Sequence, residues 1–430
     1  SSINAMIYMR GHRADYDAWA AAGNAGWSYE DVLPAIRRSE HNARGADAFH
    51  GTGGPLNVMD LRSPNPFSPR FVEAAKEAGF VANPDFNGAE QEGVGLYQVT
   101  HRNGERCSAA KAYLTPALGR ANLRVRTGAQ VTRILLEGSR AVGVELLQDG
   151  QRLSVRARRE VLLCAGALQS PQLLMLSGIG PGEELGLHLH DHPDVVLVHD
   201  LPGATDLFGL SFGGALRVLR GVGEWRRQRS GMLTTNFAEA GGFIRSDASE
   251  PLPDLQLHFV VGKLVDHGRK TVLGHGFSCH VCVLRPRSRG SVRLNSADPL
   301  AAPAIDPAFL QDPDDLRRLV AGFRQMRDIL HRPALARFGG RELSASAAAR
   351  TDAEIERFIR DHADTIYHPV GSCRMGSGPL DVVDARFRVH GLDGLRVVDA
   401  SAMPSIVGGN TNAPVIMMAE RAAEWLRAGG

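Results

Sequence analysis

The sequence predicts a mixed α/β fold in which strands alternate with amphipathic helices. Two observations support this. Residues 161–167 and 395–398 are short apolar strands, each followed by a turn and a helical pattern. Residues 123–145 and 253–261 alternate apolar and polar side chains, as strands with one buried face do. Parallel βα pieces and antiparallel pieces are therefore both expected in one chain.

The remaining elements follow from helical spacing and turn residues. Glu137–Gly138 predicts a turn that folds 123–145 into a hairpin. A basic turn at 285–290 leads into a strand at 291–294. Apolar residues at helical spacing predict helices over 15–38, 64–79, 169–179, 312–331 and 353–362.

Length and composition limit the classes of function. A chain of 430 residues is long enough for two domains. The net charge of +2 and the absence of a dense Lys/Arg run argue against a nucleic-acid partner. No apolar run approaches the roughly 20 residues of a membrane-spanning helix. Five cysteines favour a reducing compartment. We expect a cytoplasmic protein, in contact with a membrane at most peripherally.

A histidine and an asparagine near the C-terminus form the leading candidate site. His368 precedes a proline, which biases it towards extended backbone. The glycine-rich turn 408–414 opens a helical pattern, with Asn or Thr available as a cap. One small substrate can face both side chains, with His368 as base and Asn410 as hydrogen-bond donor.

Two other clusters contain the residue types of metal sites. His188, His190 and His192 stand at alternate positions and would share one face of a strand, which suggests a metallo-hydrolase. Cys279 and Cys282 have CxxC spacing but lie in an apolar strand, where their side chains should diverge. We expect no metal at either cluster, and keep the metallo-hydrolase as the less favoured alternative.

Several stretches together resemble a known family. The segments 367–376, 397–404 and 408–414 are similar to the C-terminal signature of the glucose–methanol–choline (GMC) oxidoreductases, and 161–167 is similar to a second signature. Residues 1–11 resemble the family's Gly-Gly-Ser-Ser-x-x-Asn segment without its glycines. The resemblance extends from Ser1 to about Leu426. It is closest to the bacterial alcohol and choline dehydrogenase branch.

The resemblance implies a Rossmann-like FAD-binding domain interleaved with an antiparallel-sheet substrate domain. The FAD-binding domain would comprise residues 1–55, 116–192 and 376–430. The substrate domain would comprise 56–115 and 193–375. Asp191, His192 and Pro193 match the family pattern, in which His188 replaces an asparagine; this weighs against a metal there.

Residue roles carry over by position. His368 would be the catalytic base and Asn410 the donor. The positions expected to contact FAD are Asn4, Val131, Asp399, Ala400, Asn410 and Thr411. Ile3 stands where some members carry a histidine bonded to FAD, so FAD should be held non-covalently.

The family's phosphate-binding unit is expected to be missing. Its members begin with a βαβ unit of about 30 residues carrying G-x-G-x-x-G. The glycine-rich stretch 178–182 follows a helical run and is interrupted by a proline, so it is not that fingerprint. A flavin-free, inactive fragment is therefore a second alternative.

The resemblance implies FAD-dependent oxidation of a primary alcohol to the aldehyde. The enzyme would resemble choline dehydrogenase, with a quinone-like compound favoured over oxygen as electron acceptor. Medium-chain or aromatic alcohols and choline are the leading substrates. The choice among them and the oligomeric state stay open.

Overall fold

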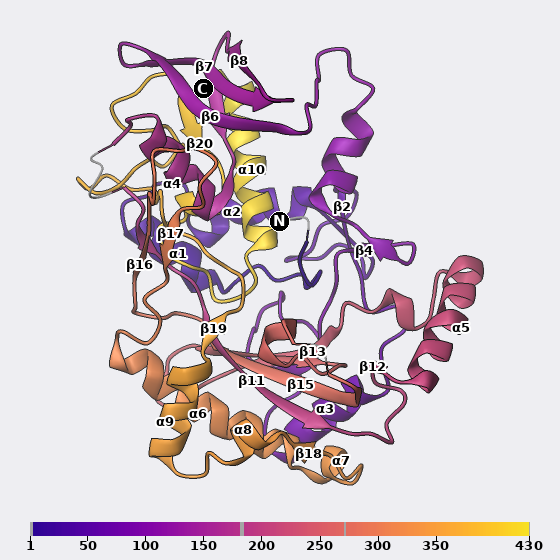
Figure 1. Ribbon diagram of the computed structural model, residues 1–430. Helices are drawn as coiled ribbons and strands as arrows, with labels where there is room; N and C mark the ends of the chain where they lie inside the picture. The colour runs from indigo at the N-terminus through magenta and orange to yellow at the C-terminus, as the bar shows by residue number, and fades with distance from the viewer. Residues whose placement is uncertain (1–2, 181–184, 271, 430) are drawn as a thin grey trace.

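A large antiparallel sheet forms one end of the molecule (Figure 1). The computed structural model describes residues 3–180, 185–270 and 272–429. Strand order is β18-β11-β15-β14-β13-β3, with β12 paired to β15 and β19 to β11. The strands are β3 (Gly93–Leu96), β11 (Pro193–Asp200), β12 (Gly209–Leu210), β13 (Ala238–Ile244), β14 (Leu255–Val260), β15 (Gly274–Val283), β18 (Arg341–Glu342) and β19 (Asp364–Thr365).

Helices cover the outer face of this sheet, and the register decides which side chains meet them. The helices are α3 (Phe67–Glu77), α6 (Pro313–Leu330), α7 (Pro333–Ala336), α8 (Ser344–Ala347) and α9 (Asp352–His362). Leu257 and Phe259 of β14 pack with Phe323 of α6 in one core. The alternate residues Gln256 and His258 point to the opposite face, because strand side chains alternate. Buried polar groups therefore line the inner face.

The other end of the molecule is built around two parallel strands. β9 (Val161–Leu163) pairs with β20 (Leu395–Val397), and the helix α4 (Gly166–Leu176) follows β9. The short 3-10 helix η5 (Ala400–Ala402) follows β20, and α10 (Asn412–Arg427) comes later. The strands β6 (Ala129–Glu137), β7 (Arg140–Gln148) and β8 (Gln151–Arg156) form a meander beside them. This arrangement is the Rossmann-type part of the mixed α/β fold.

The N-terminal helices α1 (Arg13–Ala21) and α2 (Tyr29–Ser39) complete this end. Trp27 packs edge-on against Phe387 and Trp425, with ring centroids 5.4 and 5.9 Å away. The predicted single helix over 15–38 is wrong. Gly23 and Gly26 adopt φ of +95° and +84°, which end α1 and separate it from α2.

Smaller elements join the two ends. β10 (Leu187–Leu189), β16 (Gly290–Arg293) and β17 (Ala304–Asp306) form one sheet, and β1 (Glu40–Asn42) pairs with β2 (Leu56–Val58). The others are β4 (His101–Arg102), β5 (Glu105–Arg106), the π-helix η1 (Ala110–Leu114), α5 (Phe212–Gln228) and the 3-10 helices η2 (Thr115–Ala117), η3 (Met232–Thr234) and η4 (Asp266–Gly268).

Most predicted elements are confirmed. The hairpin, the strands at 253–261 and 291–294, and the helices at 312–331 and 353–362 all form. Cys279 and Cys282 belong to different hydrophobic cores, so the CxxC thiols diverge as expected. Residues 181–184, part of the glycine-rich stretch 178–182, lie outside the described residues.

A buried ionic cluster anchors the N-terminal segment to the loop before β2. Arg10 Nη2 lies 2.5 Å from Glu40 Oε2, and both side chains are almost fully buried. His50 contacts Glu40 and Asp85 at 3.1 and 2.8 Å. Burial alone would lower the pKa of His50, but the hydrogen bonds to Asp85 and Glu40 outweigh it and raise the pKa to about 9. His50 is a charged member of this cluster rather than a simple loop histidine.

Replacing Arg10 should destabilise the protein strongly. Removing one partner of a buried ion pair costs about 3 to 5 kcal/mol, because a buried charge is left uncompensated. Arg10→Met should lower the free energy of unfolding by that amount in a denaturant titration. Arg13→Met is the matched control, since Arg13 and Glu30 are 3.5 Å apart and mostly exposed. Equal effects of the two changes would contradict a structural role for the cluster.

Candidate active site

Three segments that are distant in sequence meet beside the inner face of the large sheet. Backbone hydrogen bonds of 2.9 and 2.8 Å pair His190 with Val370 in antiparallel fashion. This pairing brings His368 close to His192. The carboxylate of Asp191 accepts hydrogen bonds from the backbone amides of both histidines, at 2.8 and 3.0 Å. Burial raises the pKa of Asp191 to about 7, although these bonds and one from Thr365 act in the opposite direction.

His368 lies between another imidazole and an amide. Its Nδ1 is 3.2 Å from Nδ1 of His192, and its Nε2 is 3.2 Å from Nδ2 of Asn410. The His192 ring stands nearly perpendicular to it, at 84°. Nε2 of His192 lies 3.2 Å from the carbonyl oxygen of Val407. The structure therefore brings the two predicted catalytic residues, His368 and Asn410, into direct contact.

These contacts determine which ring nitrogens carry protons. A carbonyl oxygen can only accept, so Nε2 of His192 must donate to Val407. Burial lowers the pKa of His192 well below its usual value, so the ring is neutral and its Nδ1 is an acceptor. Nδ1 of His368 must then donate to it. A neutral His368 consequently keeps its free lone pair on Nε2, the nitrogen that faces Asn410.

The large sheet independently orients the Asn410 amide. Nε2 of Gln256, in β14, donates to Oδ1 of Asn410 at 3.0 Å. Gln256 is fully buried and also lies 3.4 Å from the hydroxyl of Tyr97, which donates to the carbonyl of Leu257. With Oδ1 occupied in this way, Nδ2 of Asn410 points its hydrogens at His368. Two separate hydrogen-bond chains thus agree that Nε2 of His368 is an acceptor.

Burial also keeps the site uncharged. Desolvation lowers the pKa of His368 to about 4, so the half-buried ring is neutral near neutral pH. Burial holds the pKa of His258 well below its usual value, and nearby His280 and His368 add to this. Within the described residues neither ring nitrogen of His258 has a hydrogen-bond partner. A buried imidazole of this kind can hydrogen-bond a polar group of a bound molecule.

Asp399 joins the carboxyl ends of the two parallel strands. Its Oδ1 accepts from the backbone and hydroxyl of Ser401. Its Oδ2 accepts from the amide of Gly166 at 2.9 Å and from Ser170 at 2.6 Å. The carbonyl of the next residue, Ala400, accepts from Gly371 N at 3.2 Å, three residues after His368. Asp399 and Ala400 therefore lie at the strand edge that supports the His368 segment.

The other predicted contact residues lie in different surroundings. Thr411 is the N-cap residue of α10, but its side chain makes no capping bond, so the expected side-chain cap is wrong. Oδ1 of Asn4 accepts from Met6 N and from Arg106, at 2.8 and 3.0 Å. Val131 is half-buried in β6, beside a register shift. The structure does not bring Asn4 or Val131 into contact with the His368–Asn410 pair.

The predicted shared face of three histidines is wrong. His188 adopts φ of +63°, which interrupts the alternation of a strand. Nε2 of His190 lies 2.8 Å from the carbonyl of Pro286, and its Nδ1 accepts from Ile406 N. His192 instead hydrogen-bonds to His368. The rings of His190 and His192 therefore have different partners, and among the described residues the three histidines form no metal-ligand cluster.

Elsewhere in the described parts of the chain, one group of side chains has metal-ligand spacing. His199, His331 and Glu342 place ligand atoms within 4.8 Å of one another. Arg327 donates to Glu342 at 2.9 Å, so a cation already neutralises this carboxylate. The group lies at the β11–β18 margin of the sheet and is not part of the His368 site.

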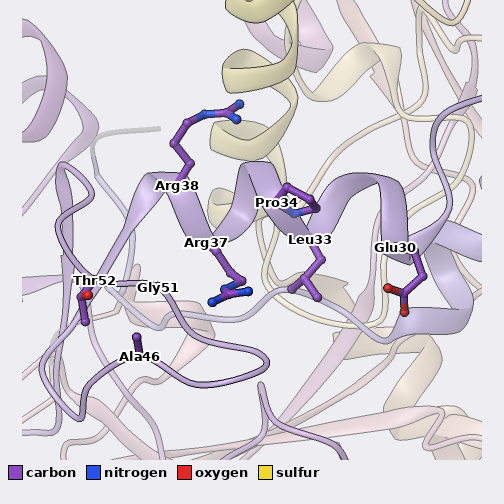
Figure 2. A pocket seen from close by; sticks show the side chains of 8 residues that line it. All are labelled: Glu30, Leu33, Pro34, Arg37, Arg38, Ala46, Gly51 and Thr52. Atoms are coloured by element: carbon purple, nitrogen blue, oxygen red, sulfur yellow. The ribbon is translucent and has the colours of Figure 1, made fainter.

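A surface cavity of about 530 Å³ lies between α2 and the loop around Gly51 (Figure 2). Arg37, Arg38 and Glu30 line it, with Arg37 directed into it and Arg38 away toward α10 in this view. It contains none of the predicted site residues. The candidate site is therefore identified by its chemistry rather than by this cavity.

Comparison with known proteins shows the family. Sequence profiles described as GMC oxidoreductase match residues 1–194 and 286–419. An alcohol dehydrogenase (acceptor) of Pseudomonas putida is 45% identical over 99% of this chain and 80% of its own length. The mitochondrial choline dehydrogenase of Mus musculus is 41% identical over 99% of this chain and 74% of its own length. The solved pyridoxine 4-oxidase from Mesorbium loti superposes with a TM-score of 0.85 and 32% identity, covering 99% of this chain and 82% of that one. The chain belongs to the GMC oxidoreductase family, and FAD is its expected cofactor.

The residues present fit a flavin at the edge formed by β9 and β20. Ligands of open parallel sheets bind at the carboxyl ends of the strands. There Cys164 is exposed, and a Cβ built on Gly166, whose φ is +85°, would meet nothing within 4 Å. The first amides of α10 are left without a side-chain cap. This backbone can approach a planar group closely, with His368 and Asn410 nearby.

Sequence reasoning missed the residues that orient this pair. The sequence indicates His192 as a possible metal ligand and places Gln256 in the strand expected at 253–261, and it assigns no element or role to Tyr97. The sequence did contain a signal for Gln256, because Gln256 and His258 are polar residues in an otherwise apolar strand. Which residues they contact depends on the pairing of β14 with distant segments.

Nuclear magnetic resonance of histidine-labelled protein should show the proton positions derived above. Nitrogen-15 shifts should report a proton on Nδ1 of His368 and on Nε2 of His192. Both rings should stay neutral as the pH falls through 6.5, because burial lowers their pKa values. His192→Phe should remove the acceptor and shift the His368 signals, whereas His192→Asn keeps an oxygen near the Nδ1 position. A His368 ring protonated on Nε2 would contradict the assignment.

Proposed function

We propose that this GMC oxidoreductase oxidises a primary alcohol to the aldehyde, with His368 as the base and Asn410 as the donor. One observation carries the proposal: the unprotonated Nε2 of a neutral, half-buried imidazole lies 3.2 Å from an oriented amide donor. A hydroxyl oxygen placed against both groups can give its proton to one and accept a hydrogen bond from the other. The names of the similar dehydrogenases support an alcohol as donor.

The proton moves first to Nε2 of His368. As it is transferred, the ring gains positive charge, and the Nδ1–H bond to His192 strengthens because it becomes charge-assisted. His192 passes this effect to the Val407 carbonyl. His192 and the Val407 carbonyl thus stabilise protonated His368 without a carboxylate. Asn410 Nδ2 stabilises the developing alkoxide, and Gln256 holds the amide in position.

FAD, when bound, supplies the acceptor for the hydride that leaves the alcohol carbon. We propose that Asp399, Ala400, Asn410 and Thr411 hold its ring end, and that Asn4 and Val131 contact it elsewhere. The FAD-binding domain would then comprise 1–55, 116–192 and 376–430, and the substrate domain 56–115 and 193–375. The open strand edge and the uncapped α10 amides support this assignment.

Residues of the inner sheet face would complete the substrate pocket. His258 is buried and has no partner among the described residues for either ring nitrogen. Glu239 of β13 accepts hydrogen bonds from Asn65 N and the Ser68 hydroxyl at 2.6 and 2.7 Å. It is therefore a structural hydrogen-bonding group rather than a substrate contact. We propose His258 as a polar contact for the substrate.

A quinone-like compound is the proposed electron acceptor, and the cytoplasm the proposed location. The acceptor-dependent alcohol dehydrogenase relative supports the former. None of the described helices is both long and apolar enough to cross a bilayer. We propose that contact with a membrane is peripheral.

An absorption spectrum tests the cofactor assignment. The purified chain, with FAD added, should show flavin bands that bleach when a primary alcohol is supplied. Acid precipitation should release the yellow chromophore, because Ile3 cannot bond it covalently. Failure to bind added FAD would support a flavin-free fragment, and a chromophore retained on the precipitate would contradict non-covalent binding.

His368→Ala should lower turnover in the flavin-loaded enzyme by about 10² to 10⁴. A base must be unprotonated to act, and the pKa of His368 is about 4. Activity should therefore fall only as the pH drops toward 4, rather than through the usual histidine value near 6.5. The pH profile of kcat/KM in wild type and variant measures this. Unchanged turnover in the variant would remove His368 from the role.

Asn410→Ala is the comparison variant and should lose less, on the order of 10² in kcat. Asn410→Asp keeps the shape but replaces the donor with an acceptor beside Nε2, so it should not restore turnover. A change in KM alone would make Asn410 a binding residue.

A further inference from the structure

Helix α5 contributes no residue to the hydrophobic core clusters found among the described residues. All 17 of its residues are described, and among them only Gly214 and Gly221 are buried. In Figure 1 it lies at the margin of the molecule, beside β12. Most helices in proteins are stabilised by packing an apolar face. This helix packs through the two glycines and half-buried side chains such as Trp225, which donates to the carbonyl of Gly104 at 2.7 Å, and it leaves Phe212, Leu216 and Leu219 exposed.

The outward side of α5 is apolar. Gly214 and Gly221 are seven residues apart and share the inward side. Phe212, Leu216 and Leu219 follow helical spacing on the opposite side, and their exposed fractions are 91%, 42% and 69%. The most exposed part of the helix is therefore also its most hydrophobic part.

Two more exposed leucines lie in the backbone bridge next to the start of α5. Leu210 and Leu273 form a bridge just before α5 and are 54% and 79% exposed. We call Leu210, Phe212, Leu216, Leu219 and Leu273 the α5 surface. A contiguous apolar patch on a folded protein usually marks a binding site.

Basic side chains flank the stripe. α5 contains four arginines and one glutamate, whereas the whole chain carries only +2. Helical spacing places Arg220 and Arg227 along one side of the stripe and Arg226 along the other, and all three are exposed. Arginine stems can lie along apolar surface while their charged ends reach outward. This pattern is that of a helix lying in the interface of an anionic membrane.

We propose that the α5 surface docks on an anionic phospholipid bilayer, with its apolar stripe in the headgroup boundary and its arginines on lipid phosphates. This deepens the peripheral membrane contact proposed above. It rests on that part of the proposed function and not on the reaction. Self-association is less favourable, because a second copy packed on the same stripe would bring the two arginine sets together. Docking would also bring the enzyme to a bilayer in which a quinone-like acceptor dissolves.

Vesicle flotation tests the proposal without requiring turnover. The chain should float with phosphatidylcholine vesicles that contain phosphatidylglycerol, and much less with phosphatidylcholine alone. Salt should weaken this binding, because exposed charges are screened. Phe212→Ser with Leu219→Ser should lower the bound fraction about tenfold. Arg220→Gln with Arg227→Gln should remove the preference for anionic lipid while leaving the apolar stripe intact.

Leu300→Ser is the matched control, since Leu300 is 60% exposed in a turn far from α5 in sequence. It should bind vesicles like wild type. Absence of wild-type binding to anionic vesicles would overturn the proposal. So would equal loss in the Leu300 control, or a dimer in solution that the Phe212 and Leu219 changes dissociate while vesicle binding stays absent. Alcohol oxidation, measured in parallel, reports on the proposed function separately.

Discussion

The carbonyl oxygen of Val407 is the fixed point on which the candidate site depends. It can only accept a hydrogen bond, so it decides the proton position on His192, and His192 then decides it on His368. The carbonyl is itself held in place by Gly408, whose amide donates to Asp15 and whose oxygen accepts from Gln91. Asp15 is paired with Arg285 at 2.8 Å. The ion pair of Asp15 and Arg285, which lies outside the site, thus helps to orient the neutral rings of His192 and His368.

Neutrality is the second constraint on the site. A carboxylate beside the His368 imidazole would raise the pKa of that ring, whereas the neutral imidazole of His192 leaves the effect of burial unopposed. The carboxylate that is present, Asp191, instead binds the backbone amides of both histidines. Asp191 therefore holds the backbone at His192 and His368 and does not hydrogen-bond their imidazole rings. The site can therefore hold a base that stays unprotonated in a largely apolar setting.

Sequence patterns predicted the local elements well and the connections between them less well. Alternation identified β14, and the amphipathic spacing identified α6, because each pattern reports one buried face. The helix over 15–38 was wrong because its apolar spacing continues through two glycines whose positive φ breaks it. The shared strand face expected for the histidines at 188, 190 and 192 is wrong for a related reason. A left-handed residue at 188 ended the alternation on which the shared face depended.

The sequence by itself determined the family, the βα character of the two parallel strands, and the pair His368 and Asn410. These follow from residue types at short range, and a turn or a strand depends mostly on its neighbours. Only the tertiary structure decided that His192, Gln256 and Tyr97 orient this pair, and that α5 presents apolar side chains outward. Gln256 and Asn410 are 154 positions apart in the sequence, and His192 and His368 are 176 positions apart. Local sequence patterns do not show which of these distant residues come into contact, because the packing of the whole chain decides it.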